Sequence, residues 1–392
     1  MRLMGTKRID LPIAIKKPVL AFGAQTKNTI CFAEGSLAYV SHSRTDLNSP
    51  RDFWDFTKSA QSFLKRKPQI IAYDLHPGYQ STRYALSLAS KTYDLAPIQH
   101  HHAHIASCMA DNGLKNQKVI SVAFDGTGLG SDNTIWGAEF LLCDYCNYQR
   151  VGHLGEVPLL GGEKAITEPW RLATFWLHSL YGERFLKLDI DFIRKIDIKK
   201  WQVLKKMQAR HFNAPLASSM GRLFDAAASL ILKKYKAAFE AELAMALEKE
   251  AGRFQGKSSG YPFKIQRIGG TCIINAGPLF RQIVSDLKAK EGKEKMAYRF
   301  HLAVAQMIIK VCLILRRQYN IEKIVLSGGV FQNNLLLTLS SHLLDKHGFK
   351  VFAPKNLSCS DSGISLGQAV IAGWRGESDV FRDSHEGKKD LR

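Results

Sequence analysis

The chain has 392 residues, of which 45% are hydrophobic and 23% are charged. These values lie near the averages of globular proteins and exclude collagen, coiled coil and wholesale disorder. A chain of this length predicts two or three lobes, at about 100–200 residues each. Its 55 Lys and Arg residues exceed its 35 Asp and Glu residues by 20. Such an excess keeps nucleic acid, anionic membranes and anionic small molecules open as partners.

The sequence shows neither a membrane span nor a leader peptide. No window approaches about 18 consecutive apolar residues, and the N-terminus lacks the apolar stretch and cleavage site of a signal peptide. The seven cysteines are scattered and odd in number, which favours free thiols in a reducing compartment. We therefore expect a cytoplasmic protein with no membrane partner.

Two similar hairpins open the two halves of the chain. Residues 20–35 and 122–140 each run from an apolar strand through a turn into a second apolar strand, with Ala-Phe before the turn and Asn-Thr-Ile after it. Hairpins share turn residues, so chance similarity is the alternative. We interpret the repeat as a duplicated α/β domain. After the first hairpin we expect a strand over 70–74 and a helix over 81–91.

The second half is largely helical, and the strand pattern returns near its end. Helices are expected over residues 169–181, 218–234, 237–251, 296–319, 333–347 and from 364, and strands over 324–326 and 350–353. Strands that alternate with helices predict α/β layers with parallel components. The expected organisation is an extension (1–17), a first lobe (18–115), a second lobe (116–374) with a helical insertion at about 160–300, and a disordered tail (375–392).

The densest chemical signal is the segment QHHHAHI, which begins at Gln99. If a helix starts near His100, then His100 and His104 lie one turn apart on the same face. That spacing allows two imidazoles to converge on one metal ion, although carboxylates from elsewhere are needed to complete a site. A solvated histidine cluster or a helix start with capping roles is the alternative.

Asp125 is the first candidate carboxylate. It ends the strand VISVAF and opens the segment DGTGLG, in which Gly126, Thr127 and Gly128 allow a backbone to approach a phosphate closely. An aspartate at the C-terminal end of a strand is well placed to bind a metal ion. A simple Asp-Gly turn is the alternative.

Asp361 is the second candidate carboxylate, and it precedes the last helix, where an N-cap is the commoner role. Before it, Gly328 and Gly329 lie between a strand and the helix that begins near Asn333. A strand that runs through glycines to a helix N-terminus predicts an anion or nucleotide contact. A structural turn is the alternative there.

Two further polar stretches are more typical of a salt-bridged surface. One is GGEKAITEPWR, which carries Lys164, and the other is SSMGRLFD, which carries Arg222 and Asp225. The lysine clusters fall on expected helices, and the RNP pattern of an RNA-binding protein is missing. Nucleic acid is therefore an unfavoured partner.

These signals together resemble one family. In order, the chain carries GAQTKNT, DLHPGYQSTRYA, QHHHAHIAS, FDGTGLGSDNTIWGAEF, GGEKAITEPWR, APLASSMGRLFDA, FHLAVA, LSGGVFQNNLLL and SDSGISLGQA. This series resembles the C-terminal carbamoyltransferase domain of the hydrogenase maturation protein HypF, from about residue 18 to 374. The resemblance implies the duplicated α/β fold of actin, sugar kinases and heat-shock ATPases, with two lobes around a central cleft.

The resemblance also implies an activity and a site. His100, His104, Asp125 and Asp361 would hold one divalent metal, iron or zinc. The nucleotide- and substrate-binding set implied by the family comprises Gly126, Thr127, Gly128, Lys164, Arg222, Asp225, Glu240, Gly328, Gly329 and Asn333. The donor would be carbamoyl-adenylate, an ATP-derived nucleotide. The acceptor would be the C-terminal cysteine of a HypE-like partner.

The chain departs from the family pattern in places. The family's Tyr-Glu-Gly reads Phe239-Glu240-Ala241, and its Asn-Asp-Gly-Gly reads Ser360–Gly363. The sequence carries no acylphosphatase, zinc-finger or YrdC-like part, so a separate YrdC-like protein is the expected source of the donor. Two other functions stay open: O-carbamoyl transfer to a small-molecule hydroxyl, and a non-catalytic nucleotide-binding scaffold for a YrdC-type protein.

Overall fold

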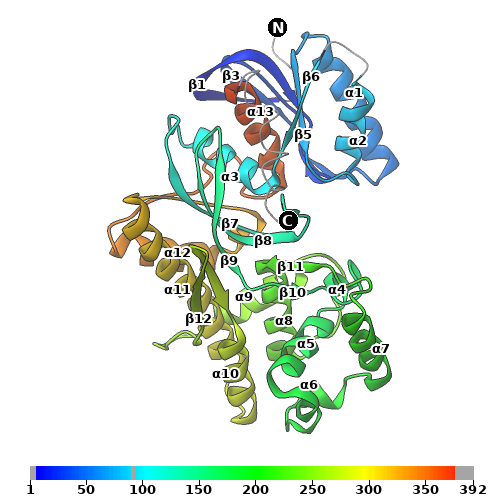
Figure 1. Ribbon diagram of the computed structural model, residues 1–392, viewed down its shortest axis with the longest axis vertical. Helices are drawn as coiled ribbons and strands as arrows, with labels where there is room; N and C mark the ends of the chain where they lie inside the picture. The colour runs from blue at the N-terminus through cyan, green and yellow to red at the C-terminus, as the bar shows by residue number, and fades with distance from the viewer. Residues whose placement is uncertain (1–5, 90–92, 376–392) are drawn as a thin grey trace, which may run out of the picture.

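A computed structural model of the chain describes residues 6–89 and 93–375. Its first sheet has the strand order β3-β1-β5-β6. The strands are β1 (Thr6–Ala21), β3 (Cys31–Ser41), β5 (Ile70–Asp74) and β6 (Asp94–Ile98), and a separate small pair is formed by β2 (Thr26–Asn28) and β4 (Arg44–Asp46). This sheet and its helices form the upper lobe in Figure 1.

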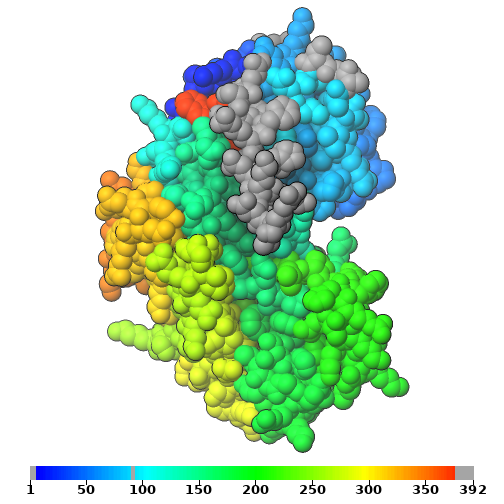
Figure 2. Space-filling model, viewed as in Figure 1, coloured from blue at the N-terminus to red at the C-terminus, as the bar shows by residue number. Residues whose placement is uncertain are grey.

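The second sheet is larger and follows the order β12-β13-β9-β8-β7-β14-β15, with β10 and β11 beside it. Its strands are β7 (Val119–Leu129), β8 (Ile135–Cys143), β9 (Tyr148–Leu154), β10 (Val157–Pro158), β11 (Leu216–Ser219), β12 (Lys264–Ile268), β13 (Thr271–Asn275), β14 (Lys323–Ser327) and β15 (Lys350–Phe352). A notch separates the blue first lobe from the green helical region on one side of the molecule (Figure 2).

The two sheets repeat one topology, and this confirms the predicted duplication. β1 pairs antiparallel with β3, and β7 pairs antiparallel with β8. β5 and β6 then extend the first sheet in parallel, as β14 and β15 extend the second. A helix follows the last strand of each set: α3 (His100–Asp111) after β6 and α13 (Ile364–Arg375) after β15.

The lobe boundaries differ from the expected ones at both ends of the chain. β1 begins at Thr6, which pairs with Ser41, so residues 6–17 belong to the first sheet rather than to a separate extension. The reason is an alternation of buried side chains with period two along this segment: Ile9, Leu11, Ile13 and Ile15. The tail that we expected to be disordered lies beyond Arg375, outside the described residues.

The last helix belongs to the first lobe, not to the second as expected. α13 packs on α3 and on β1, and its buried face joins the core that these elements share. A Cβ on Gly367 would lie 1.8 Å from the carbonyl oxygen of Ala103, so the two helices touch backbone to backbone. The remaining helices of this lobe are α1 (Pro50–Leu64) and α2 (Gln80–Ser87). The expected end of α2, at residue 91, lies outside the described residues.

A mostly helical block separates β10 from β14, as expected for the insertion. It contains α4 (Lys164–Thr167), α5 (Trp170–Tyr181), η1 (Gly182–Lys187), α6 (Asp191–Arg194), α7 (Ile198–Ala209), α8 (Met220–Leu232), α9 (Glu242–Ala251), α10 (Gly277–Lys288) and α11 (Lys293–Tyr319). It also supplies β11, β12 and β13 to the second sheet, which the helical interpretation missed. Two elements follow it, η2 (Gly329–Gln332) with α12 (Asn334–Lys346), and η3 (Asp361–Gly363).

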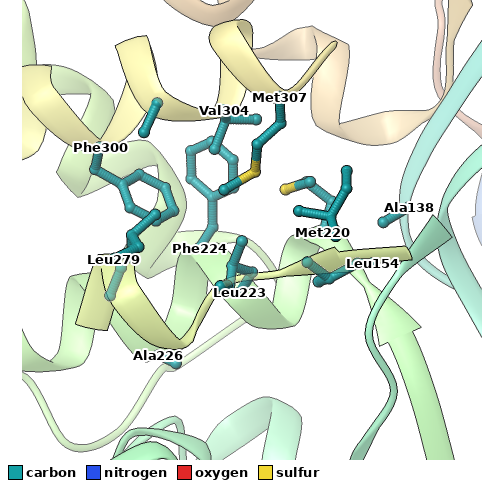
Figure 3. Packing of buried hydrophobic residues seen from close by; sticks show 14 of the residues in the cluster. Ala138, Leu154, Met220, Leu223, Phe224, Ala226, Leu279, Phe300, Val304 and Met307 are labelled. Carbon is teal, nitrogen blue, oxygen red and sulfur yellow. The ribbon is translucent and has the colours of Figure 1, made fainter. Parts of the chain in front are cut away.

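The core of this block explains the long helix α11. By length and composition α11 could cross a membrane, and no other described helix could. However, 61% of its apolar window is buried inside the protein. Figure 3 shows Phe300, Val304 and Met307 of α11 facing Phe224 and Met220 of α8. Such burial is the behaviour of a core helix.

Candidate metal centre and cleft

Two buried histidines on the first turns of α3 form the centre of the site. The Gln99 side chain caps the helix by accepting a hydrogen bond from the His102 amide, so the helix begins at His100 as predicted. The rings of His100 and His104 lie 5.0 Å apart between centroids. Both side chains are buried, so the solvated-cluster alternative is wrong.

Asp125 and Asp361 come to these histidines from two other parts of the fold. Asp125 Oδ2 lies 2.9 Å from His104 Nε2 and 3.4 Å from His100 Nε2. Asp361 Oδ1 lies 3.5 Å from His104 Nε2. One donor atom from each of the four residues lies within 4.8 Å of the others. Two imidazole nitrogens and two carboxylate oxygens fit iron or zinc. Asp361 therefore faces the histidines, where an N-cap was the commoner expectation.

Asp74, at the end of β5, orients this cluster from behind. Its Oδ2 lies 2.8 Å from His100 Nδ1, and its Oδ1 accepts a hydrogen bond from the His76 amide. An Nδ1–H that donates to Asp74 leaves the Nε2 lone pair of His100 facing Asp125 and Asp361. Partners of this kind fix the tautomer and the ring orientation of a metal ligand. The sequence analysis predicted the strand but missed the role of Asp74.

The charges in the cluster reinforce one another. Burial opposes ionisation of Asp125, but hydrogen bonds from His100 and His104 hold the pKa of its carboxyl well below the usual range. Burial likewise opposes the charged form of His100, but Asp74 and Asp125 raise the pKa of its imidazole well above the usual value. Without a cation, the aspartates thus draw protons onto the histidines. A metal ion would replace those protons.

Glycines of β7 and of the turn after the neighbouring strand β14 bring backbone close to the cluster and to Glu240. A Cβ on Gly126 would lie 2.5 Å from Glu240 Oε1, and one on Gly329 would lie 2.9 Å from Asp125 Oδ1. Gly128 touches the rings of His100 and His101. Gly328 has φ +102°, and a Cβ there would lie 2.3 Å from the Phe124 carbonyl oxygen. Gly328 therefore has a structural role as well, because only glycine fits this approach.

Arg222 and Asp225 are buried beside Gly126, so the interpretation as a surface salt bridge is wrong. Arg222 Nε lies 2.9 Å from Asp225 Oδ2, and both side chains are about 2–3% exposed. Arg222 Nη2 lies 3.8 Å from Glu240 Oε1. Among the described residues, Arg222 Nε and Nη1 have no hydrogen-bond partner of good geometry. Buried donors of this kind call for a ligand or water.

Burial also changes the ionisation of the carboxyl groups of Asp225 and Glu240. It raises the pKa of Asp225 to about 6, with Arg222 acting against the shift and Glu240 adding to it. Burial raises the pKa of Glu240 too, although Arg222 opposes it. Asp225 and Glu240 therefore keep their protons to a higher pH than carboxyl groups ordinarily do.

Three residues of the predicted nucleotide- and substrate-binding set lie outside the cluster of His100, His104, Asp125 and Asp361. Asn333 caps α12 by accepting a hydrogen bond from the Leu336 amide, and its Nδ2 lies 2.9 Å from His301 Nε2. Thr127 lies in β7 and is partly buried. Lys164 is exposed on α4, and its charge acts on Glu168. The structure thus gives Asn333 a structural role and does not bring Lys164 into contact with the four candidate metal-binding residues.

The loop after β5 contributes two site residues that the sequence analysis missed. The rings of His76 and Tyr79 stack, with centroids 4.3 Å apart. Burial and the charges of Asp74, Asp361 and Asp125 raise the pKa of Tyr79 well above its usual value, which places this side chain beside the cluster. The available signal was the motif DLHPGY directly after a buried parallel strand, where site residues gather.

The topology and the site together define the class of protein. The chain has the two-lobed, duplicated α/β fold of actin, sugar kinases and heat-shock ATPases, with a four-donor cluster in its cleft. A family model described as "Carbamoyltransferase, Kae1-like Domain, second subdomain" matches residues 121–368, and one described as "HypF Kae1-like domain" matches residues 14–111. The chain belongs to this HypF carbamoyltransferase family.

Individual relatives agree with the family models. Carbamoyltransferase HypF of Synechocystis sp. is 35% identical over an alignment of 377 residues, and the match covers 92% of this chain and 48% of that protein. A carbamoyltransferase HypF homolog of Cupriavidus necator is 34% identical, and the match covers 94% of each chain. The crystal structure of full-length HypF in its phosphate- and nucleotide-bound form has a TM-score of 0.87 at 36% identity, over 94% of this chain and 47% of that one. The chain thus spans about half the length of most curated HypF proteins that it matches.

Proposed function

We propose that this protein transfers a carbamoyl group from carbamoyl-adenylate to the cysteine thiolate of a HypE-like acceptor protein. The observation that carries the proposal is the convergence of His100, His104, Asp125 and Asp361 on one point. The names of the relatives support the reaction type. The nucleotide-bound form of the HypF relative supports the nucleotide donor.

The proposed reaction is a substitution at the carbamoyl carbon. The acceptor sulfur forms a bond to that carbon, the bond from the carbon to the phosphate oxygen breaks, and AMP leaves with the electron pair. The acceptor thiol gives up its proton before the attack, because the thiolate is the nucleophile. The products are a thiocarbamate on the acceptor and AMP.

The chain's own residues bind and orient the donor in this proposal. The four donor residues would hold iron or zinc, which when bound supplies a Lewis acid that polarises a carbonyl or phosphoryl oxygen. Asp74 keeps His100 in the required tautomer. Arg222, whose Nη1 has no hydrogen-bond partner among the described residues, would bind the phosphate of the adenylate beside Gly126.

Partners outside this chain complete the proposed reaction. A YrdC-like protein or domain would form the carbamoyl-adenylate, and the reaction would run in the cytoplasm, where thiol acceptors stay reduced. The thiocarbamate on a HypE-like cysteine would be the precursor of the cyanide ligand in nickel–iron hydrogenases, so hydrogenase maturation is the proposed process.

Metal content and donor binding test the proposal directly. Mass spectrometry should find about one iron or zinc ion per chain, and titration calorimetry should detect a non-hydrolysable analogue of carbamoyl-adenylate. The double variant His100→Ala/His104→Ala should lose both signals. A control variant of two exposed histidines, His342→Ala/His347→Ala, should keep both. A metal-free wild-type protein that ignores the analogue would overturn the proposal.

A further inference from the structure

One face of α7 is basic and carries no acidic side chain. Lys199, Val203, Lys206 and Arg210 follow one another at intervals of four, three and four residues, which places them on one side of the helix, all exposed. In the described part of the chain, the three cations form no ion pair with an acidic group. By contrast, Lys205 on the flank of the helix pairs with Glu183.

Exposed apolar side chains gather on the same segment. Of the nine large apolar side chains that are exposed in the described chain, four fall between residues 198 and 216. They are Ile198 (53% exposed), Val203 (57%), Phe212 (68%) and Leu216 (45%). Single exposed apolar residues are ordinary, but a cluster is typical of an interaction site. We call Ile198, Lys199, Val203, Lys206, Arg210 and Phe212 the α7 surface.

The fold does not require this surface to be basic and apolar. Trp201 and Leu204 are buried on the opposite side of α7 and anchor it to the core. The Asp197 side chain caps the helix by accepting a hydrogen bond from the Lys200 amide. The α7 surface thus makes no contribution to these contacts, and α7 lies at the outer edge of the helical region (Figure 1).

The α7 surface leads toward the cleft. The loop that carries Phe212 is bonded to the segment before α4, because Asn213 O accepts from the Gly161 amide and Pro215 O accepts from the Leu159 amide. Glu163, two residues beyond Gly161, is close enough to act on the charge of His76 in the first lobe. The loop after α7 thus joins this helix to the segment that precedes α4.

We propose that the α7 surface binds an acidic polypeptide segment with an apolar anchor, contributed by the acceptor protein whose thiol enters the cleft. This inference rests on the proposed function and extends it to the docking site. The unpaired cations favour an acidic partner, and charge complementarity would also speed its encounter. Phe212 is the one aromatic side chain of the α7 surface, and Ile198 and Val203 are aliphatic, so the surface offers no row of aromatic rings on which successive bases could stack and fits a polypeptide better than single-stranded RNA.

A labelled peptide tests the docking site without the acceptor. The probe is a fluorescein-tagged 15-residue peptide of Glu and Asp with Leu and Phe at every fourth position. A second peptide has Lys in place of its acids. Fluorescence anisotropy is measured near physiological ionic strength, where charges more than about 8 Å apart are largely screened. We expect the acidic peptide to bind and the lysine peptide not to bind.

Charge reversal should locate the binding. Lys199→Glu/Lys206→Glu/Arg210→Glu should weaken the acidic peptide at least about 10-fold, and Val203→Ser/Phe212→Ser should weaken it about 3-fold or more without changing the net charge. The control Lys288→Glu/Lys290→Glu/Arg317→Glu makes the same change in charge at exposed residues elsewhere and should leave the affinity within about 2-fold. Equal losses in both triple variants would overturn the proposal.

Two further measurements distinguish a failure of this inference from a failure of the proposed function. Metal content and binding of the carbamoyl-adenylate analogue should be unchanged in the α7 variants, so a protein that fails those tests but still binds the peptide contradicts only the proposed function. Competition with bulk tRNA identifies the alternative partner. If tRNA binds and its binding is lost in the α7 triple variant while the peptide never binds, the surface is a nucleic-acid site and the proposal is wrong.

Discussion

The two halves of the fold share a topology but contribute different chemistry. In the first half, α3 follows β6 and carries both histidines of the cluster. In the second half, α13 follows β15, and Asp361 lies just before it in η3. The hairpins differ in the same way: Gly23 follows Ala21-Phe22 in the first, whereas Asp125 follows Ala123-Phe124 in the second. A duplicated fold therefore builds one asymmetric site from equivalent positions.

The contact between α3 and α13, the equivalent helices of the two halves, fixes how the halves pack against each other. Gly367 of α13 lies against the backbone of Ala103 in α3, one residue before His104 of the four-donor cluster. Thr29 of the first half also holds the segment that carries Asp361, because its hydroxyl donates a hydrogen bond to the carbonyl of Ser362, the residue after Asp361. Packing between the halves thus determines how closely the carboxylates approach the histidines.

The largest expected effect comes from disrupting that contact. Gly367→Ala places a Cβ 1.8 Å from the Ala103 carbonyl oxygen, so α3 and α13 must separate, and the free energy of unfolding should fall by roughly 3 kcal/mol or more. Urea denaturation measures the loss. Gly252→Ala is the matched control, because its Cβ would meet nothing closer than 3.6 Å and should change stability by less than about 1 kcal/mol. A stable Gly367→Ala protein would mean that the helices are not in this close contact.

The second expected effect concerns Asp225, a buried acid in the helical block of the second half. Asp225 has a pKa raised to about 6 by burial, so the folded state holds its proton more tightly than the unfolded chain does. Its ionisation therefore lowers stability as the pH rises from about 4 through 6, by up to about 3 kcal/mol. Below that window the penalty is absent.

Urea denaturation of the wild type and of Asp225→Asn at pH 4.5 and pH 7 measures this contribution. The difference in unfolding free energy, wild type minus variant, should be lower at pH 7, because only the wild type ionises there. Asp345→Asn, which changes an exposed carboxylate, should show no such trend. Parallel pH profiles for the wild type and Asp225→Asn would place the pKa of Asp225 near its ordinary value.

The third prediction compares the orienting aspartate of the first half with an aspartate at the opposite end of the neighbouring strand. Asp74→Asn keeps the shape of the side chain but removes the charge that holds His100, and metal affinity should fall about 10- to 100-fold. Asp94→Asn, at the start of β6, removes an exposed carboxylate and should leave metal affinity unchanged. Competition with a chelating dye measures both, and equal affinities in the two variants would remove Asp74 from the site.

The sequence predicted which four donor residues converge better than it predicted their surroundings, and the reason is physical. The positions of His100 and His104 follow from helical spacing and a cap, which are local properties. Asp125 and Asp361 stand in recognisable motifs, although Asp125 lies inside β7, which runs on to Leu129, rather than at the end of the strand as expected. Burial of Arg222 and Asp225 depends instead on how α8 packs against the second sheet, which no local pattern reveals. Likewise, the return of α13 to the first lobe requires knowledge of long-range packing, and β11 and β13 were hidden in a mostly helical segment.

The smallest expected effect concerns the residue that follows Glu240 in the cleft. Ala241 is the N-cap of α9 and has φ +67°, ψ 3°, a left-handed conformation in which an alanine is less stable than a glycine by roughly 1 kcal/mol. Ala241→Gly should therefore raise the free energy of unfolding by about that amount. Part of this gain is lost because glycine has more conformational entropy than alanine in the unfolded chain. The control Ala244→Gly, inside α9, should lower stability by about 1 kcal/mol because glycine is a poor helix former. Thermal denaturation of the two variants should give shifts of opposite sign. If both variants are destabilised, Ala241 is not strained, and the chain has adapted to alanine at this edge of the cleft.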